Sequence, residues 1–288
     1  MTSVPSDPAA GQSPEERLAA LGLSMAYFVF GYRRPAVDIT IDPARLPPIR
    51  ESLPLLAGVT DGEPDSGNSV TVHQNGSLIS ELMRAIEGAR STVHFETYVW
   101  CSGKLEEDFL SLMSKKARQG LTVRVLIDAV GGQKASKDRI RQACEAGVQV
   151  AFYRPFGSST IRRFNHRNHR KLMIIDGAAA YVFGHGISDE WLGEAQDSQH
   201  WRDTGVGIRG PGVNHLQTIF CKDWIASTGR IPPEPDCFQR PDPQGDAVVH
   251  SASSTGDSQS SASLLYKLAI IVAEKDIVIQ NPYFVPDP

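Results

Sequence analysis

The chain has 288 residues, a formal net charge of −4 and a sequence pI near 6.1. This acidic balance is not that of a general nucleic-acid-binding protein, which concentrates lysine and arginine and has a high pI. The 41% hydrophobic and 22% charged content is ordinary for a globular protein, and the length is enough for one large or two ordinary domains. The four cysteines form no Cys-x-x-Cys pair, so we expect free thiols in a reducing compartment.

The first 68 residues are predicted to precede the folded domain. Residues 1–16 are rich in Ser, Pro, Ala and Gly, which predicts a disordered tail, and they lack the basic start of a signal peptide. Residues 18–31 are the most apolar stretch, but they are shorter than the roughly 20 residues that span a bilayer. A helix resting on a membrane and a helix packed in the core are equally good interpretations. The Pro and Gly in residues 35–67 predict an irregular arm.

Residues 69–228 alternate between strand-like and helix-like patterns and are predicted to form one lobe. This alternation predicts an α/β fold, a mixed or parallel sheet flanked by helices on both faces. Ligands bind at strand ends in such folds, so we expect Asp128, His169 and the loop after Tyr153 to meet. Strands are expected at residues 70–72, 92–100, 121–128, 148–153, 172–175, 179–183 and 204–209, and helices at 78–86, 105–117, 138–146 and 213–224.

The last 60 residues are predicted to form a linker and the start of a second lobe. Residues 229–245 are dense in Pro and Gly and predict a linker. Within residues 246–288 we expect a strand at 246–250, a helix around 264–271 and a strand at 277–279. Residues 273–283 weakly repeat the pattern of residues 89–98, which predicts the start of a second, incomplete lobe.

One motif concentrates chemistry. His169, Lys171 and Asp176 flank the apolar run Leu172-Met173-Ile174-Ile175, which predicts a buried strand. Side chains alternate along a strand, so His169, Lys171 and Ile175 should share one face while Arg170, Leu172 and Asp176 take the other, unless a turn at Gly177 brings Asp176 back. Neutral imidazole is a good nucleophile near pH 7, and lysine binds phosphate as a point charge. Further cations precede the motif at Arg162, Arg163 and Arg167, which predicts an anionic substrate.

Several segments around this motif together resemble the phospholipase D superfamily, and most closely its cardiolipin synthase-like branch. The likeness extends from about residue 70 to residue 286. It is carried by His-x-Lys-x4-Asp-Gly at residues 169–177, Gly184-His185-Gly186-Ile187-Ser188-Asp189-Glu190-Trp191, Trp201-Arg202-Asp203-Thr204, Phe220-Cys221-Lys222-Asp223-Trp224, the upstream Phe95-Glu96-Thr97-Tyr98-Val99-Trp100 and the final Asn281-Pro282-Tyr283-Phe284-Val285-Pro286.

The resemblance implies a bilobal enzyme with one such motif per lobe and an active site between the lobes. It also implies a metal-free, two-step displacement at a phosphodiester through a phosphohistidine. His169 would be the nucleophile, Lys171 would neutralise phosphoryl oxygens, and Asp176 would orient a histidine directly or across the interface. If the second copy kept the first copy's spacing, its own His-x-Lys would fall roughly 65 residues beyond Pro288, so we expect a fragment or truncated product.

The same resemblance assigns substrate-binding residues. These are Gly184, Gly186, Ser188, Arg167 and Asp203. The family commonly has Gly-Gly-x-Asn after the motif, whereas this chain has Phe183-Gly184-His185-Gly186, so the phosphate contact of that Asn is replaced by backbone amides.

The sequence leaves three functions open. The first is a phosphatidyltransferase or phospholipase acting on an anionic, phosphatidylglycerol-like lipid at a membrane surface. The second is a nuclease or phosphodiesterase of the same superfamily, and the third is an inactive truncated half-enzyme. We expect no metal or other cofactor, since Arg167 and Arg170 flank the ligand-like pair His166 and His169 and would repel a cation. The expected partner is a missing second lobe or a second copy, with no nucleic acid, and the expected location is the cytoplasmic face of the cell membrane.

Overall fold

The computed structural model describes residues 51–60, 62–155, 167–233, 235–238, 241–251 and 261–281. The chain divides into two compact units, and all of these residues belong to the unit formed by Asp42–Pro155 and His166–Pro288. The predicted tail, the apolar stretch at 18–31, the arm up to residue 50 and the cations Arg162 and Arg163 lie outside the described residues, as does His166.

An eight-stranded mixed sheet forms the centre of this unit, in the order β4-β3-β2-β5-β6-β7-β1-β8. The pairs β2–β3 and β3–β4 are parallel, and the remaining neighbours are antiparallel. The strands are β1 (Glu63–Gln74), β2 (Thr92–Thr97), β3 (Thr122–Asp128), β4 (Gln149–Tyr153), β5 (Leu172–Ile175), β6 (Ala179–Phe183), β7 (Thr204–Arg209) and β8 (Ala247–Ser251).

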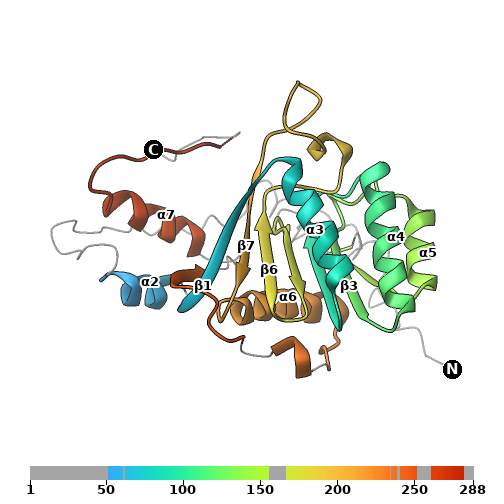
Figure 1. The fold of residues 1–288 in the computed structure, drawn as a ribbon, viewed down its shortest axis with the longest axis horizontal. Helices are drawn as coiled ribbons and strands as arrows, with labels where there is room; N and C mark the ends of the chain where they lie inside the picture. Colours follow the sequence, from blue (N-terminus) through green and yellow to red (C-terminus); the bar gives the residue numbers. More distant parts are fainter. Residues whose placement is uncertain are drawn as a thin grey trace, which may run out of the picture. The chain divides into compact units, whose positions relative to one another are not determined.

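Helices cover both faces of the sheet, which confirms the predicted fold class (Figure 1). On one face lie α3 (Gly76–Gly88), α4 (Lys104–Arg118) and α5 (Lys137–Glu145), and on the other lies α6 (Val213–Thr228). Strand alternation divides the two cores: Met173 and Ile175 of β5 face α3 and α4, whereas Leu172 and Ile174 face α6. The faces predicted for Ile175 and Leu172 are therefore correct. Asp176, predicted on the Leu172 face, instead lines a surface pocket with Arg84 and Ala85 of α3, because the strand has ended and Asp176 has φ of 54°.

The irregular arm predicted at residues 35–67 is wrong where the structure describes it. Helix α2 (Leu53–Thr60) is followed by β1, which begins at Glu63. Proline is tolerated in the first turn of a helix, where Pro54 lies, and in an edge pairing such as that of Pro64 with His250 of β8. Gly67, with φ of 85°, lies where the β1–β8 register shifts, so this glycine serves a bulge inside a strand.

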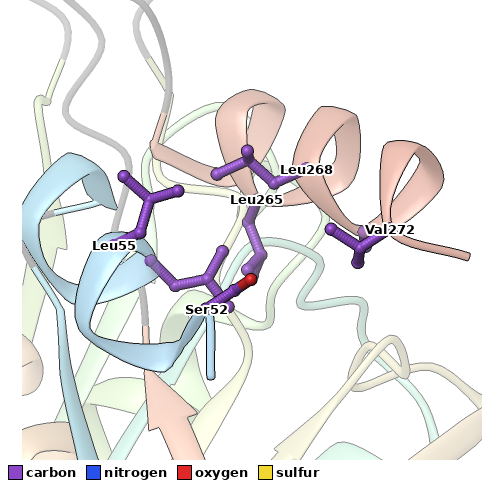
Figure 2. Close-up of a pocket in the computed structure, with 7 residues that line it drawn as sticks. Ser52, Leu55, Leu265, Leu268 and Val272 are labelled. Atoms are coloured by element: carbon purple, nitrogen blue, oxygen red, sulfur yellow. The ribbon is translucent and has the colours of Figure 1, made fainter. Parts of the chain in front are cut away.

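The C-terminal elements are only partly as expected. The predicted strand at 246–250 forms as β8, and it pairs with β1 of the same sheet. The predicted helix forms as α7 (Ser261–Ile271), which packs against α2 around an apolar pocket lined by Leu55, Leu265, Leu268 and Val272 (Figure 2). Residues 277–279 form no strand, and Val278 is 89% exposed. A β-branched run only favours extension, and a strand also needs a neighbour to bond.

Among the helices that the structure describes, none is long and apolar enough to cross a bilayer.

Candidate active site

The ends of five neighbouring strands lie together at one end of the sheet, along the direction of the strands. The carboxyl ends of β2, β3 and β6 meet the amino ends of β5 and β7 there, because β5 and β7 run antiparallel to their neighbours. The converging segments bring together Tyr98 after β2, Asp128 at the end of β3, His169 and Lys171 before β5, Gly184 after β6 and Asp203 before β7. The predicted meeting of Asp128 with the His169 loop is confirmed, since Asp128 Oδ2 accepts a hydrogen bond from the Asn168 amide at 3.0 Å.

His169 and Lys171 are the reactive residues at this end of the sheet. The Lys171 Nζ atom lies 3.1 Å from Nδ1 and 3.3 Å from Nε2 of His169, and it donates to the His169 carbonyl oxygen at 2.9 Å. The ring of Tyr98 packs beside both, with its centroid 4.7 Å from that of His169 and 5.7 Å from Lys171 Nζ. Lys171 is buried, whereas His169 is exposed. An exposed imidazole therefore lies above a buried cation.

The protonation states of this pair suit attack on phosphorus. Desolvation and the nearby Lys171 charge lower the pKa of His169, against the carboxylate of Asp128, so the imidazole is neutral at pH 7. Desolvation lowers the pKa of Lys171 to about 8, against the carboxylate of Asp203, so its amine remains mainly a cation at pH 7. A neutral nucleophile and a cation for phosphoryl oxygens are both available.

Asp203 and Gly184 form the opposite wall of the site. The Asp203 carboxylate lies directly over Gly184, because a Cβ atom at Gly184 would be 2.5 Å from Asp203 Oδ1. The buried His185 donates from Nε2 to the Asn75 carbonyl oxygen at 2.9 Å, and its Nδ1 lies 3.8 Å from Asp203 Oδ2. Burial lowers the pKa of His185, against Asp203 and the Asn75 carbonyl, so this histidine is a neutral structural neighbour of the wall.

The other predicted substrate-binding residues make contacts with neighbouring parts of the chain. A Cβ atom at Gly186 would lie 2.7 Å from both the Val99 side chain and the Trp191 ring, so this glycine permits a close approach. The buried Ser188 hydroxyl donates to the Glu190 carboxylate. Arg167 donates to the Arg154 carbonyl oxygen at 3.1 Å, and its guanidinium lies 3.8 Å from the Asp128 carboxylate. It therefore joins the loop before β5 to the ends of β3 and β4.

Asp176 lies at the far end of β5 from His169. Its carboxylate accepts hydrogen bonds from the amides of Arg90, Ser91 and Thr92 and from the Ser91 hydroxyl, at 2.8 to 3.2 Å. The expected direct contact with His169 is therefore wrong. The strand between them, at about 3.3 Å per residue, holds the two side chains well apart, and Asp176 instead fixes the start of β2.

Sequence reasoning missed the residues behind the motif. Asn168, Arg170 and Asp223 are joined by hydrogen bonds, and the fully buried Glu96 lies among them. One sequence signal was available, because Glu96 is a carboxylate in a strand whose β-branched and aromatic residues predict burial, and all six residues of β2 are buried. Its partners come from β5 and α6 and are not visible in local spacing.

Comparisons with known proteins identify similar families and chains. Residues 82–224 match the family model described as cardiolipin synthase, PLD-like domain. Cardiolipin synthase 2 of Bacillus cereus is 34% identical over 221 residues, which is 75% of this chain and 43% of that protein. Cardiolipin synthase A of Pseudomonas syringae pv. syringae is 33% identical over 228 residues, which is 77% of this chain and 47% of that protein. The solved structure of Nuc, a phospholipase D family member from Salmonella typhimurium, has 16% identity and a TM-score of 0.43, and the match covers 58% of this chain and 99% of that one.

The mixed sheet, with a histidine–lysine pair at the ends of its central strands, defines a phospholipase D-type lobe. The family model and the curated relatives show that the chain belongs to the phospholipase D superfamily, in its cardiolipin synthase-like branch, as the sequence motifs predicted. The chain spans just under half the length of the curated relatives it matches.

Proposed function

We propose that this chain supplies the His169–Lys171 half of an active site that transfers or hydrolyses the phosphodiester of an anionic, phosphatidylglycerol-like phospholipid. The observation that carries the proposal is the exposed, neutral imidazole of His169 lying 3.1 Å from the buried Lys171 cation. The two relatives named cardiolipin synthase support a lipid phosphodiester as the substrate.

The proposed reaction has two displacements. The imidazole of His169 attacks phosphorus and forms a P–N bond, while the P–O bond to the leaving alcohol breaks and that oxygen takes a proton from a general acid. An acceptor alcohol then attacks phosphorus, returns its proton to the same group and releases His169. An alcohol acceptor gives phosphatidyl transfer, and water gives hydrolysis. Lys171 stabilises the charge on the non-bridging oxygens in both steps.

The general acid is proposed to be a second histidine from another lobe or a second copy of the chain. The 288 residues contain a single His-x-Lys-x4-Asp motif, at His169. Asp203 lies on the wall of the site that it forms with Gly184, and it is proposed to bind groups of the substrate or of that partner. An anionic lipid substrate places the reaction at a membrane surface, proposed here to be the cytoplasmic face.

The test is turnover of phosphatidylglycerol vesicles by the 288-residue chain and by the protein isolated from its source. We expect release of glycerol, which His169→Ala abolishes and His200→Ala leaves unchanged, since His200 is hydrogen-bonded to Asp197 outside the site. Cleavage of DNA in place of lipid would support the nuclease alternative. Absence of turnover from both preparations would support an inactive half-enzyme and overturn the proposal.

A further inference from the structure

The loop that carries His169 is held on its α6 side by the neighbouring side chains, which alternate in direction along the loop. His169 and Lys171 face the site, and Arg170 between them faces α6, where its guanidinium pairs with the Asp223 carboxylate. Asn168 donates from Nδ2 to Asp223 Oδ2 at 3.1 Å, and its Oδ1 accepts from the Arg170 amide at 3.0 Å. Asp223 on α6 therefore holds the residues on both sides of His169.

This contact is shielded from water on both sides. The side chain of Arg170 is 25% exposed and that of Asp223 is 13% exposed. Charge-assisted hydrogen bonds at such partly buried positions are stronger and less screened than surface ion pairs. Asn168 is itself buried, and its backbone amide is bound to Asp128 at the end of β3, so the loop is attached to two different elements.

Glu96 lies beneath this contact. It is fully buried on β2, opposite Leu172 of β5, and neither carboxyl oxygen makes a hydrogen bond of standard geometry with the described residues. Burial and the Asp223 carboxylate raise the pKa of Glu96 to about 8, against the opposing effects of Arg170 and Asn168. Two carboxyl groups this close do not both ionise at neutral pH. The charge resides on Asp223, which has the guanidinium and amide donors, and the proton resides on Glu96.

Other charged and titratable groups also act on Asp223 and its surroundings. Burial raises the pKa of Asp223, while Arg170, Arg154 and Asn168 oppose that rise. Burial also raises the pKa of the Tyr153 hydroxyl on β4, which is influenced by the same two arginines and by Asp223 and Asp128. The α6-facing side of the sheet also carries His94 of β2 and Arg124 of β3, both buried. Arg124 Nη1 lies 3.0 Å from His94 Nε2, and the two side chains pack on Phe220 and Trp224 of α6.

We propose that Asp223, acting through Asn168 and Arg170, is the positioning residue that sets the orientation and hydration of the His169 imidazole, and that Glu96, buried on β2 opposite Leu172, maintains this contact. Ionised Glu96 would compete with Asp223 for the Arg170 guanidinium and loosen the loop. The inference uses the role that the proposed function gives to His169, but it concerns the loop, and its test requires no turnover.

The experiment is NMR titration of the His169 ring, assigned with His169→Ala, together with amide hydrogen exchange over residues 168–171. In the wild type we expect the pKa of His169 below its ordinary value of about 6.5. In Asp223→Asn we expect it to rise to that value, because the released imidazole hydrates, and we expect loop exchange to accelerate by at least about tenfold. Asp108→Asn is the matched control, since Asp108 forms an exposed ion pair with Lys104 on α4.

Two further variants keep the proposal open to contradiction. Arg170→Lys keeps the charge but loses the planar guanidinium, so we expect a smaller change of the same sign if Asp223→Asn does not fold. Glu96→Gln should behave as the wild type at pH 7. Above about pH 8 we expect the wild-type loop to lose exchange protection beyond the rise of the base-catalysed intrinsic rate, and we expect Glu96→Gln to keep that protection. An unchanged His169 titration in both Asp223→Asn and Arg170→Lys would overturn the positioning role. An equal loss of protection above about pH 8 in Glu96→Gln and in the wild type, each compared with the intrinsic exchange rate, would overturn the role of Glu96.

Discussion

Replacing Asp176 with alanine distinguishes a structural role from the catalytic role that its place in the motif suggested. The carboxylate receives hydrogen bonds from three consecutive amides and one hydroxyl at the start of β2, at 2.8 to 3.2 Å. Hydrogen bonds to a charged group contribute about 1.5–3 kcal/mol each when buried, and water replaces part of this at the exposed Arg90 amide. The residue also has φ of 54°, a conformation that aspartate and asparagine tolerate better than alanine.

Together these effects predict that Asp176→Ala lowers the free energy of unfolding by about 3 kcal/mol. Asp176→Asn keeps one carbonyl acceptor and the tolerated backbone, so we expect about half that loss. Urea unfolding followed by tryptophan fluorescence measures both. Asp197→Ala is the control, because this exposed carboxylate binds only nearby residues of its own loop and should cost under about 0.5 kcal/mol.

The account also predicts that the folded Asp176→Ala protein keeps the wild-type titration of His169. An unchanged urea midpoint, combined with a shifted His169 pKa, would show that Asp176 acts on the histidine and that its bonds to β2 matter little.

Three more predictions concern single residues. Gly186→Ala should lower the free energy of unfolding by about 1–3 kcal/mol in urea, since its Cβ atom would lie 2.7 Å from Val99 and Trp191, and an unchanged midpoint would contradict this. Glu96 has a higher pKa in the folded protein than in the unfolded chain, so its contribution is fully present below about pH 4.5 and is lost as pH rises through about 8. Urea unfolding measured from pH 5 to 9 should show the free energy of unfolding falling by no more than about 5 kcal/mol from this cause. Glu96→Gln should remove this part of the pH dependence. Lipid turnover should fall as pH rises through about 8, where Lys171 loses its proton; a rate that keeps rising to pH 10 would contradict its role as a cation.

Much of the fold was visible in local patterns. The β-branched and aromatic run of β2 and the apolar period of α4 identified both elements, and strand alternation correctly placed Met173 and Leu172 on opposite faces. Local rules failed where a partner decides the structure. Pro54 and Pro64 suggested an arm, but a first helical turn tolerates proline, and so does the start of β1, which pairs with β8 alone before β7 joins it at Ser69.

The site was also predictable only where local spacing determines it. The pairing of His169 with Lys171 follows from their spacing in the extended segment that enters β5, and it was predicted. The separation of Asp176 from His169 also follows from that spacing once the strand between them is straight, but a turn at Gly177 was allowed to return the carboxylate. The contact of Arg170 with Asp223 joins residues 53 positions apart, so no sequence window contains it.

The most direct test of the central claim is the capture of the covalent intermediate. Incubation with phosphatidylglycerol vesicles, rapid alkaline quenching and peptide mass spectrometry should locate a phosphoryl adduct on His169. The account predicts that this adduct appears with the wild type and is absent from His169→Ala. Lipid turnover that continues in His169→Ala, or an adduct on another residue, would contradict it.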